Sequence, residues 1–444
     1  MKKILIINAR IVNEGSIFPG DVFIQNGRID TIGKGLTGRQ ADITIDAAGR
    51  VLMPGMIDGH AHFREPGLTH KGDIASESRA AVAGGITSYL EMPNTLPPTT
   101  TDKRLVEKNR IASRTSLANY GFYLGASADN LDEIKGIDPR RVCGIKVFMG
   151  ASTGNLLVDQ PDALGRIFAE APVLVAVHCE DTAIIQKNET VFRSRFGEDV
   201  PILHHPDIRN VDACYQSTSL AVKLARQHGT RLHVLHLSTQ KELSLFSSAP
   251  LSQKTITAEA CVHHLFFTID DYRDKGTLIK CNPAIKARRH RAALIGAVLD
   301  GRIDTIATDH APHTLAEKEK TYFKAPSGLP LVQHALVSLL EGYHRGAFSL
   351  ELIVEKAAHA PAIVFQIEDR GFIREGYWAD LVLVDLDRPW TVSPKTNQSR
   401  CGWSPFDGYR FRSSVITTIV SGHLAWHAGK IDSGTAGQPL EFQR

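Results

Sequence analysis

Two histidines separated by one residue follow an apolar run near the start of the chain. The run covers residues 51–57 and predicts a buried strand, and His60 and His62 come directly after it. Alternate residues of a strand point to the same face, so both imidazoles face one point and Arg64 continues the row. Two such imidazoles form half of a metal site, and an arginine beside them can hold a carboxylate through paired hydrogen bonds. In a chain with 19 histidines, a lone pair of this kind can also be incidental.

Bulk composition excludes several classes of protein. The 444 residues are 43% hydrophobic and 22% charged, and the formal net charge is only +3. There is no basic stripe with interleaved aromatic residues, so we expect no nucleic-acid partner. The N-terminal apolar run is too short for a signal peptide, and nothing approaches the ~18 apolar residues of a membrane span. Six scattered cysteines without a Cys-x-x-Cys pair indicate free thiols, so we expect a cytoplasmic protein that does not bind membranes.

After residue 53 the sequence alternates between apolar strand-like runs and helix-like stretches. Eight such strand and helix units in succession predict an α/β protein built on a TIM (β/α)8 barrel. The helix-like stretches include residues 73–83, 163–170, 213–227 and 289–299. The expected barrel strands cover residues 56–63, 87–92, 120–125, 144–149, 173–178, 231–237, 255–261 and 303–308.

The two ends of the chain have a different pattern, rich in short strands. Before residue 53 there are strand-like runs at 4–7, 11–12, 21–24 and 43–45, with a hairpin signal at Asn26-Gly27. Residues 329–366 predict further helix, and strand-like runs return at 377–385, 414–420 and 424–427. Neither end is large enough for a core of its own. We therefore expect a β domain in two parts, 1–53 and 371–444, beside a barrel domain at 54–370.

The expected barrel strands carry polar residues where they end. His178 ends the fifth strand, His236 lies at the end of the sixth, and Asp309 follows the eighth. The chemistry of TIM barrels sits at the C-terminal ends of the strands, so these side chains join His60 and His62 at one place. Four imidazoles and one carboxylate are enough for two divalent ions, although a bridging group is missing.

Lys146 could supply that bridging group. It lies in the otherwise apolar fourth strand, where a charged amine is costly. One interpretation is a core lysine paired with a carboxylate. The other is a carbamate, in which the neutral amine takes up carbon dioxide and becomes an anion between two metals. Within this set of residues we favour the carbamate.

Four sequence blocks, in this order and spacing, resemble the signature motifs of dihydroorotases within the amidohydrolase superfamily. The resemblance covers nearly the whole chain. The blocks are Asp-Gly-His-Ala-His-Phe-Arg-Glu-Pro-Gly at 58–67, Met-Pro-Asn-Thr at 92–95, Lys-Cys-Asn-Pro at 280–283 and Ala-Thr-Asp-His-Ala-Pro-His at 307–313.

The resemblance implies a role for each ligand candidate. His60 and His62 would bind the more buried metal together with Asp309, and His178 and His236 would bind the second. Carboxylated Lys146 and a hydroxide would bridge the two. The implied cofactors are two divalent metal ions, with zinc expected, and carbon dioxide as the carbamate.

It also implies substrate contacts. Arg64, Asn94 and His313 match positions that hold the substrate carboxylate. Asn282 and the turn at 328–330 match positions that contact the pyrimidine ring. The two asparagines have an ordinary alternative, because either could cap or open a turn.

The implied activity is the reversible cyclisation of N-carbamoyl-L-aspartate to L-dihydroorotate, a step of de novo pyrimidine (UMP) biosynthesis. Asp309 would act as the general acid and base. The substrate is thus a small molecule. The sequence leaves the oligomeric state open, a homodimer included.

Other activities stay open as alternatives. Hydantoinases and dihydropyrimidinases share the metal set, but their substrates need no carboxylate clamp, and allantoinases are not expected to carry Arg64 with the Met-Pro-Asn-Thr block. A further class is an inactive dihydroorotase-like scaffold subunit, which typically loses ligands that this chain keeps. We expect no ligand role for the histidines at 204–205 in a surface loop, for the pair at 263–264, or for His310, which should point away from the Asp309 face.

Overall fold

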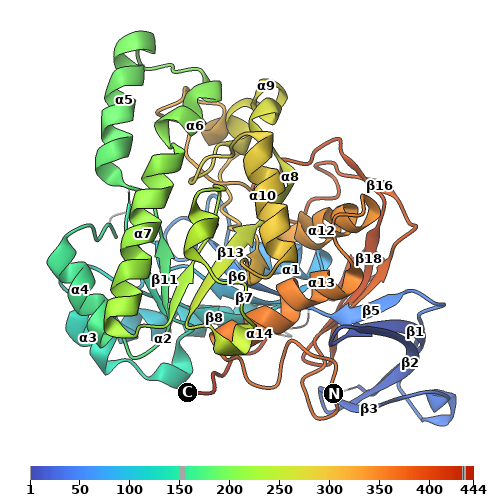
Figure 1. Cartoon of the computed structure of the whole chain (residues 1–444). Coiled ribbons are helices and arrows are strands. Elements are labelled where there is room, and N and C mark those ends of the chain that lie inside the picture. The colour runs from blue at the N-terminus through green and yellow to red at the C-terminus, as the bar shows by residue number, and fades with distance from the viewer. Residues whose placement is uncertain (1, 151–155, 433, 435–436) are drawn as a thin grey trace.

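The computed structural model describes residues 2–150, 156–432, 434 and 437–444. Residues 1, 433, 435 and 436 of the two predicted β segments, and residues 151–155 of the predicted barrel domain, lie outside this description. The chain forms a barrel of parallel strands with helices around it, and a second β-sheet, which contains the N-terminal strands, lies beside the barrel (Figure 1). No helix in the described part of the chain is long and apolar enough to cross a membrane.

The barrel strands follow one another around the axis in chain order. A six-stranded parallel sheet runs β14-β13-β12-β11-β10-β9, and a three-stranded one runs β6-β7-β8. A parallel bridge between Ala61 and His310 joins the first strand to the segment after the last. The predicted (β/α)8 barrel is therefore confirmed. Its third strand is interrupted at Tyr123 and consists of β8 (Asn119–Phe122), which pairs with β7, and β9 (Leu124–Gly125), which pairs with β10. The other seven are β6 (Met56–Ala61), β7 (Ile86–Glu91), β10 (Ile145–Phe148), β11 (Val175–His178), β12 (Leu232–Val234), β13 (Ile256–Cys261) and β14 (Thr305–Ala307).

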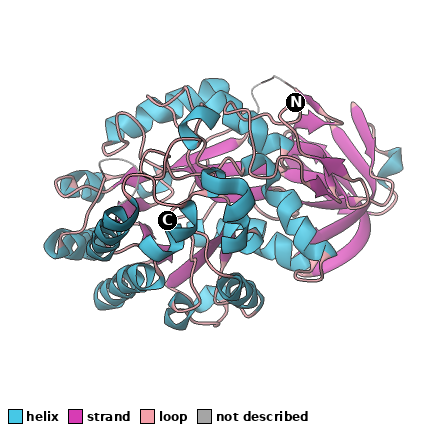
Figure 2. Cartoon of the chain, turned by 90° about the horizontal axis from the view of Figure 1, so that it is seen from above, coloured by secondary structure: helices cyan, strands magenta, loops and turns pink. Residues whose placement is uncertain are grey.

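Helices cover the outside of the barrel, as the view from above shows (Figure 2). The four helices expected from sequence are present as α1, α4, α7 and α10. The bounds are α1 (Ile74–Ala83), α2 (Asp102–Thr115), α3 (Leu131–Gly136), α4 (Pro161–Glu170), α5 (Thr182–Phe196), α6 (His205–Ile208), α7 (Val211–His228), α8 (Val262–Phe266), α9 (Tyr272–Lys275), α10 (Arg288–Leu299), α11 (Leu315–Lys318), α12 (Ala335–His344), α13 (Leu350–Val354) and α14 (Ala360–Phe365).

Helix α7 shows how local sequence sets these bounds. The Asn210 side chain accepts a hydrogen bond from the backbone N–H of Ala213, which satisfies one of the free donors of the first turn. Gly229 ends the helix in the left-handed conformation, at φ 69°, which a glycine adopts without a side-chain clash. Seven of its residues, all small or apolar, are buried on one side. That face packs the helix against the barrel.

The outer sheet combines both ends of the chain. Its strands lie in the order β20-β19-β18-β15-β5-β1-β2-β3, with β4 paired to β1. The predicted pairing of N- and C-terminal segments is therefore confirmed. The strands are β1 (Ile4–Asn13), β2 (Ser16–Gln25), β3 (Arg28–Gly33), β4 (Ile43–Asp46), β5 (Val51–Pro54), β15 (Leu381–Asp385), β18 (Ser414–Val420), β19 (His423–His427) and β20 (Lys430–Ile431); β16 (Trp390–Thr391) and β17 (Arg410–Phe411) form a separate pair.

One sequence prediction is wrong in this region. The apolar run 51–57 is two strands, because the chain changes sheets at Gly55. A Cβ at Gly55 would lie 2.1 Å from a side-chain carbon of Thr87, so the crossing point has room only for glycine. β5 belongs to the outer sheet and β6 opens the barrel. The expected hairpin at Asn26-Gly27 is present, with positive φ at both residues, 54° and 80°.

The C-terminal segment is tied to the barrel by a buried carboxylate. Asp380, just before β15, forms an ion pair with Arg370. It accepts hydrogen bonds from the side-chain amide of Asn119 in β8, at 3.0 and 3.1 Å, and from the backbone N–H of Ser421 at 2.7 Å. Arg370 and Asp380 are each 3% exposed. A single side chain thus links the barrel with the outer sheet.

We expect Asp380→Ala to lower the free energy of unfolding by about 3–5 kcal/mol, because the change leaves the buried Arg370 guanidinium with only the uncharged partners Ser421 and Gln438. Urea unfolding measures this difference. Asp387→Ala, at an exposed position, is the matched control and should stay within ~0.5 kcal/mol of the wild type. An Asp380→Ala protein as stable as that control would contradict the linking role.

Candidate functional site

A pocket opens at the C-terminal ends of the barrel strands. It contains the four histidines, the lysine and the aspartate that sequence analysis singled out, together with three of the four predicted substrate residues. The lining residues are His60, His62, Arg64, Asn94, Lys146, Phe148, His178, His236, Asn282, Asp309, Ala311, Ser327 and Gly328.

Asp309 lies between His60, in β6, and His62, directly after that strand. Its Oδ1 is 3.1 Å from the Nε2 atom of His60 and 3.1 Å from the Nε2 atom of His62. All three side chains are nearly buried. Two imidazole nitrogens and a carboxylate oxygen therefore converge, as the ligands of a divalent metal do.

The outer nitrogen of each of these rings also has an oxygen partner. His60 Nδ1 is 2.9 Å from Glu259 Oε1, and His62 Nδ1 is 2.8 Å from Asn94 Oδ1. Because both partners accept, each Nδ1 carries a proton, and each Nε2 faces Asp309. Outer partners of this kind orient metal-binding histidines and fix their tautomer.

A second histidine pair faces the first across the pocket. His178 Nδ1 lies 2.9 Å from His236 Nε2, and His178 Nε2 lies 3.2 Å from the carboxylate of Glu180. Glu180 in turn forms an ion pair with Arg209. The rings of His60 and His236 are 5.3 Å apart, so the four imidazoles form one continuous group.

Three residues of the site have an unusual backbone conformation. Arg64, His236 and Asp309 adopt positive φ angles of 70°, 40° and 49°. This conformation costs a non-glycine residue about 1–3 kcal/mol, and surrounding contacts must hold it. One such contact is the hydrogen bond from the backbone N–H of His236 to Glu259, at 3.2 Å. The chain turns sharply at these points, which directs the side chains into the pocket.

Burial and nearby charges set the protonation states of the first pair and its carboxylate. Burial alone would raise the pKa of Asp309, but His60 and His62 outweigh it and hold that pKa well below its ordinary value. Burial alone would lower the pKa of His60, but Asp309 and Glu259 outweigh it and raise the pKa to about 9. The pKa of His62 falls to about 4, mainly through burial. Asp309 is therefore a carboxylate at neutral pH.

Lys146 is buried without a hydrogen-bonding partner. Its side-chain amine lies 4.5 Å from the ring centre of Phe148, and Nζ has no acceptor among the described residues. Burial lowers the pKa of this amine to about 7. A large share of the amine is therefore neutral at physiological pH, and the described residues include no carboxylate paired with it, as the core ion pair would require.

Arg64 brings a positive charge to the pocket wall. Its side chain donates to the carbonyl of Pro312 at 3.1 Å and lies 3.0 Å from His313 Nε2. Burial lowers its pKa only to about 10, so the guanidinium stays charged at neutral pH. Among the described residues, no carboxylate oxygen lies within 4.0 Å of the guanidinium. A buried cation of this kind calls for an anionic ligand.

The remaining substrate candidates are placed differently from one another. Asn94 and Asn282 line the pocket, and Ser327 Oγ donates to Asn282 Oδ1 at 3.0 Å. His313 does not line the pocket; it lies behind Arg64, with its Nδ1 atom 3.0 Å from Lys71 Nζ. A Cβ at Gly328 would lie 2.5 Å from the carbonyl oxygen of Ala311, so this turn also needs glycine.

Sequence analysis missed the carboxylates that support the site. Glu259 and Glu180 are fully buried behind the histidines. The signal for Glu259 was a lone carboxylate in an apolar strand, in Thr-Ala-Glu-Ala-Cys. Burial alone would raise the pKa of Glu259, but His60 and His233 outweigh it and lower the pKa to about 2. The Glu259 carboxylate therefore accepts hydrogen bonds at any physiological pH.

Two other histidine predictions have opposite outcomes. His310 does point away from Asp309, as expected: its Nε2 lies 2.9 Å from Glu77 in α1. The surface-loop placement of residues 204–205 is wrong for His205, which is fully buried beside Tyr322 and the carbonyl of Cys281. It lies in the short helix α6 and is one of the buried residues of that helix.

The fold and the pocket together define a class, the TIM-barrel hydrolases that carry an extra β domain. The family model described as "Amidohydrolase family" matches residues 51–425. The chain belongs to the amidohydrolase family, and it is therefore a hydrolase.

Curated relatives and solved structures extend over the whole chain. A protein named dihydroorotase from Halobacterium salinarum is 36% identical over 96% of this chain and 98% of its own. An allantoinase from Solibacter usitatus is 33% identical over 99% of this chain and 97% of its own. The solved L-hydantoinase (dihydropyrimidinase) from Arthrobacter aurescens is 29% identical, with a TM-score of 0.94, covering 99% of this chain and all of that one.

Proposed function

We propose that this protein is a dihydroorotase, which interconverts N-carbamoyl-L-aspartate and L-dihydroorotate in de novo pyrimidine biosynthesis. The observation that carries the proposal is the buried Arg64 guanidinium, which lines the pocket beside the clustered histidines and has no carboxylate partner within 4.0 Å among the described residues. Dihydroorotate is a cyclic amide with a carboxylate on its ring, so one ligand satisfies both features. The relatives named dihydroorotase support the same activity.

The donor set fits two divalent ions. His60, His62 and Asp309 would hold one, and His178 and His236 the other, with zinc suited to imidazole and carboxylate donors. When bound, the metals would supply an activated water and polarise the ring carbonyl. Neutral imidazoles are the form that binds metal, and burial lowers the pKa values of His62, His178 and His236.

Lys146 is proposed to be the group shared by both metals. Its amine attacks the carbon of carbon dioxide, a C–N bond forms, and the amine proton leaves, which yields a carbamate anion. Only the neutral amine has the lone pair for this step, and a pKa of about 7 makes that form available. The partnerless Nζ atom, facing the pocket, is the supporting observation.

Asp309 is proposed to carry the proton. In ring opening, the carboxylate takes a proton from the attacking water and passes it to the ring nitrogen as the amide bond breaks. In ring closure, the protonated acid helps water to leave. The pKa of Asp309 lies well below its ordinary value because His60 and His62 stabilise the carboxylate. The state that starts ring opening is therefore the populated one at neutral pH.

The substrate carboxylate would lie against Arg64, with Asn94 beside it. A guanidinium can hold a carboxylate by two parallel hydrogen bonds. His313 would act from behind, because it contacts Arg64 and does not reach the pocket wall. Asn282, held by Ser327, would contact the ring.

The competing functions predict different pockets. Hydantoin and dihydrouracil carry no carboxylate, so a hydantoinase has no use for a buried arginine that lacks a carboxylate partner. Allantoin is likewise uncharged at that position. A scaffold subunit has no need of metal ligands, whereas this chain keeps the complete donor set in one pocket.

This proposal assigns a role to each part of the chain. The catalytic domain would be residues 54–370, and the β domain would combine residues 1–53 and 371–444. The six cysteines are free, which supports a reducing compartment, the cytoplasm.

We expect Arg64→Met to reduce kcat/KM for dihydroorotate by about 30-fold to several thousand-fold, because loss of a buried charge partner costs roughly 2–5 kcal/mol. Steady-state kinetics measures the change. Arg302→Met, which removes a surface arginine paired with Asp300, is the matched control and should leave kcat/KM unaltered. An Arg64→Met enzyme with wild-type kcat/KM would show that this arginine does not bind substrate.

We expect Lys146→Ala to lose most of its metal and its activity, because the anion between the metals is gone. Short carboxylic acids such as acetate or propionate should restore part of the activity by occupying the space. Metal analysis and dihydroorotate turnover, with and without the added acid, are the measurements. The carbamate is ruled out by a Lys146→Ala protein that keeps both its metal content and its activity.

We expect the two directions of the reaction to respond oppositely to pH. Ring closure consumes a proton and needs protonated Asp309, so its rate should rise as pH falls, whereas ring opening needs the carboxylate and should rise with pH. Both rates are measured on one metal-loaded preparation across the neutral range. Asp309→Asn should abolish both. Parallel profiles, or an active Asn variant, would remove Asp309 from proton transfer.

A further inference from the structure

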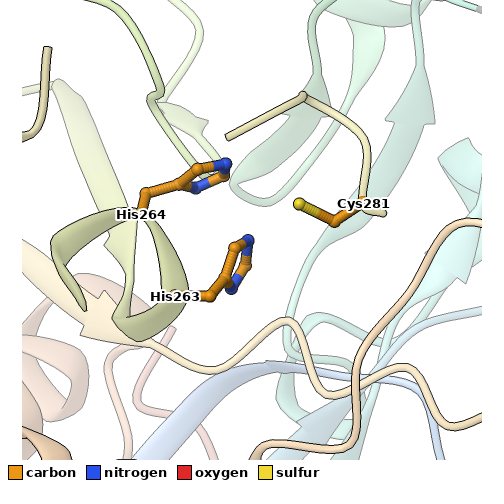
Figure 3. Close-up of side chains that lie close together, drawn as sticks. All are labelled: His263, His264 and Cys281. Carbon is orange, nitrogen blue, oxygen red and sulfur yellow. The ribbon is translucent and has the colours of Figure 1, made fainter. Parts of the chain in front are cut away.

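A second cluster of possible metal ligands lies outside the pocket lining. His263 and His264 are in α8, directly after β13, and Cys281 lies in the segment before α10. One ligand atom from each of the three side chains lies within 4.8 Å of the other two. The two rings and the sulfur face a common space (Figure 3). None of the three residues lines the pocket.

These histidines have ring nitrogens without regular hydrogen bonds in the described chain. Both ring nitrogens of His263 are buried without a hydrogen bond of regular geometry, although the Thr308 backbone lies near enough to raise the pKa of the ring, and Nδ1 of His264 is buried without a hydrogen-bonding partner. The side chains belong to residues that are 1% and 4% exposed. Buried polar atoms left without a partner are rare and cost free energy, so a ligand bound to these ring nitrogens is the simplest explanation.

The hydrogen bond of His264 Nε2 shows which nitrogen of this ring is free to bind a metal ion. Nε2 lies 3.0 Å from the carbonyl oxygen of Pro283, which can only accept, so Nε2 carries the proton. The lone pair is then on Nδ1. A backbone carbonyl in this position orients metal-binding histidines in many proteins. Burial also lowers the pKa of His263 to about 4 and holds the pKa of His264 well below its usual value, so both rings are neutral.

Cys281 completes a set of mixed nitrogen and sulfur donors. Its Sγ lies 3.3 Å from the same Pro283 carbonyl and is almost fully buried. Contrary to the expectation from sequence that the pair at 263–264 has no ligand role, we propose that His263, His264 and Cys281 bind a further divalent metal ion, of the type that favours imidazole with thiolate, such as zinc. On binding, the Cys281 thiol loses its proton to solvent and the sulfur–metal bond forms, so one proton is released per ion.

The bound ion would have a structural role next to the substrate pocket. Cys281 precedes Asn282, which lines the pocket, and Pro283 follows. An ion held by α8 and by Cys281 would fasten this turn to the end of β13. The buried Lys286 ammonium lies near His264 and opposes a cation there, but its Nζ is directed to Ser238 and Ala284, and the new thiolate supplies a compensating negative charge.

The test uses cobalt as a spectroscopic probe of the full-length protein. Chelator-treated protein is reloaded with Co²⁺ alone, and the near-ultraviolet absorption from sulfur-to-cobalt charge transfer is recorded with the cobalt content per chain. We expect the wild type to show this band. Cys281→Ser should lose the band and one equivalent of cobalt. Cys143→Ser, which changes a buried cysteine outside every ligand cluster, is the matched control and should keep both.

Two results would overturn the proposal: a wild type without the sulfur band, or a band that survives in Cys281→Ser. Cys261 lies near His60 and Glu259, and a band that disappears only in Cys261→Ser would place the ion there instead. Should Cys281→Ser fail to fold, X-ray absorption of the Cys261→Ser protein decides, because a cobalt bound at Cys281 keeps one sulfur neighbour there and a cobalt bound at Cys261 loses it. None of these readouts uses dihydroorotate turnover, so the two proposals fail separately.

Discussion

The closure of the barrel between its first and last strands is the constraint on which the site depends. The backbone N–H of His62 donates to the carbonyl of His310 at 2.7 Å, and Asp58 accepts from both the N–H and the hydroxyl of Thr308. These contacts place Asp309 between His60 and His62, although about 250 residues separate them in the chain. A shift of this seam would move the carboxylate away from both imidazoles.

Around that seam the protein holds groups that its own side chains do not satisfy. The Lys146 amine has no acceptor among the described residues, and the Arg64 guanidinium has no carboxylate within reach. Burying such groups opposes folding, so the large apolar core of the barrel must outweigh them. The unsatisfied groups are those that carbon dioxide, metal ions and a carboxylate substrate would complete. The groups that would give the pocket its substrate specificity therefore lower the stability of the fold.

Much of this arrangement could be predicted from sequence because it depends on periodicity and on strand ends. The eight apolar runs located the barrel strands, and the rule that chemistry lies at their C-terminal ends brought His178 and His236 to His60. The sequence could not predict which residues lie behind the pocket. One apolar run is divided between two sheets at Gly55, where Thr87 leaves no room for a side chain. His313 contacts Arg64 from outside the pocket. Both arrangements depend on contacts between residues distant in sequence.

The central claim is that the pocket selects a cyclic amide bearing a carboxylate. The direct measurement is kcat/KM of the metal-loaded wild type for dihydroorotate and for dihydrouracil, which differs from it by that carboxylate alone, with hydantoin and allantoin for comparison. The account predicts that dihydroorotate is preferred by roughly 30-fold or more, the factor that corresponds to about 2 kcal/mol of a buried charge contact. Equal or faster turnover of dihydrouracil, hydantoin or allantoin would contradict it.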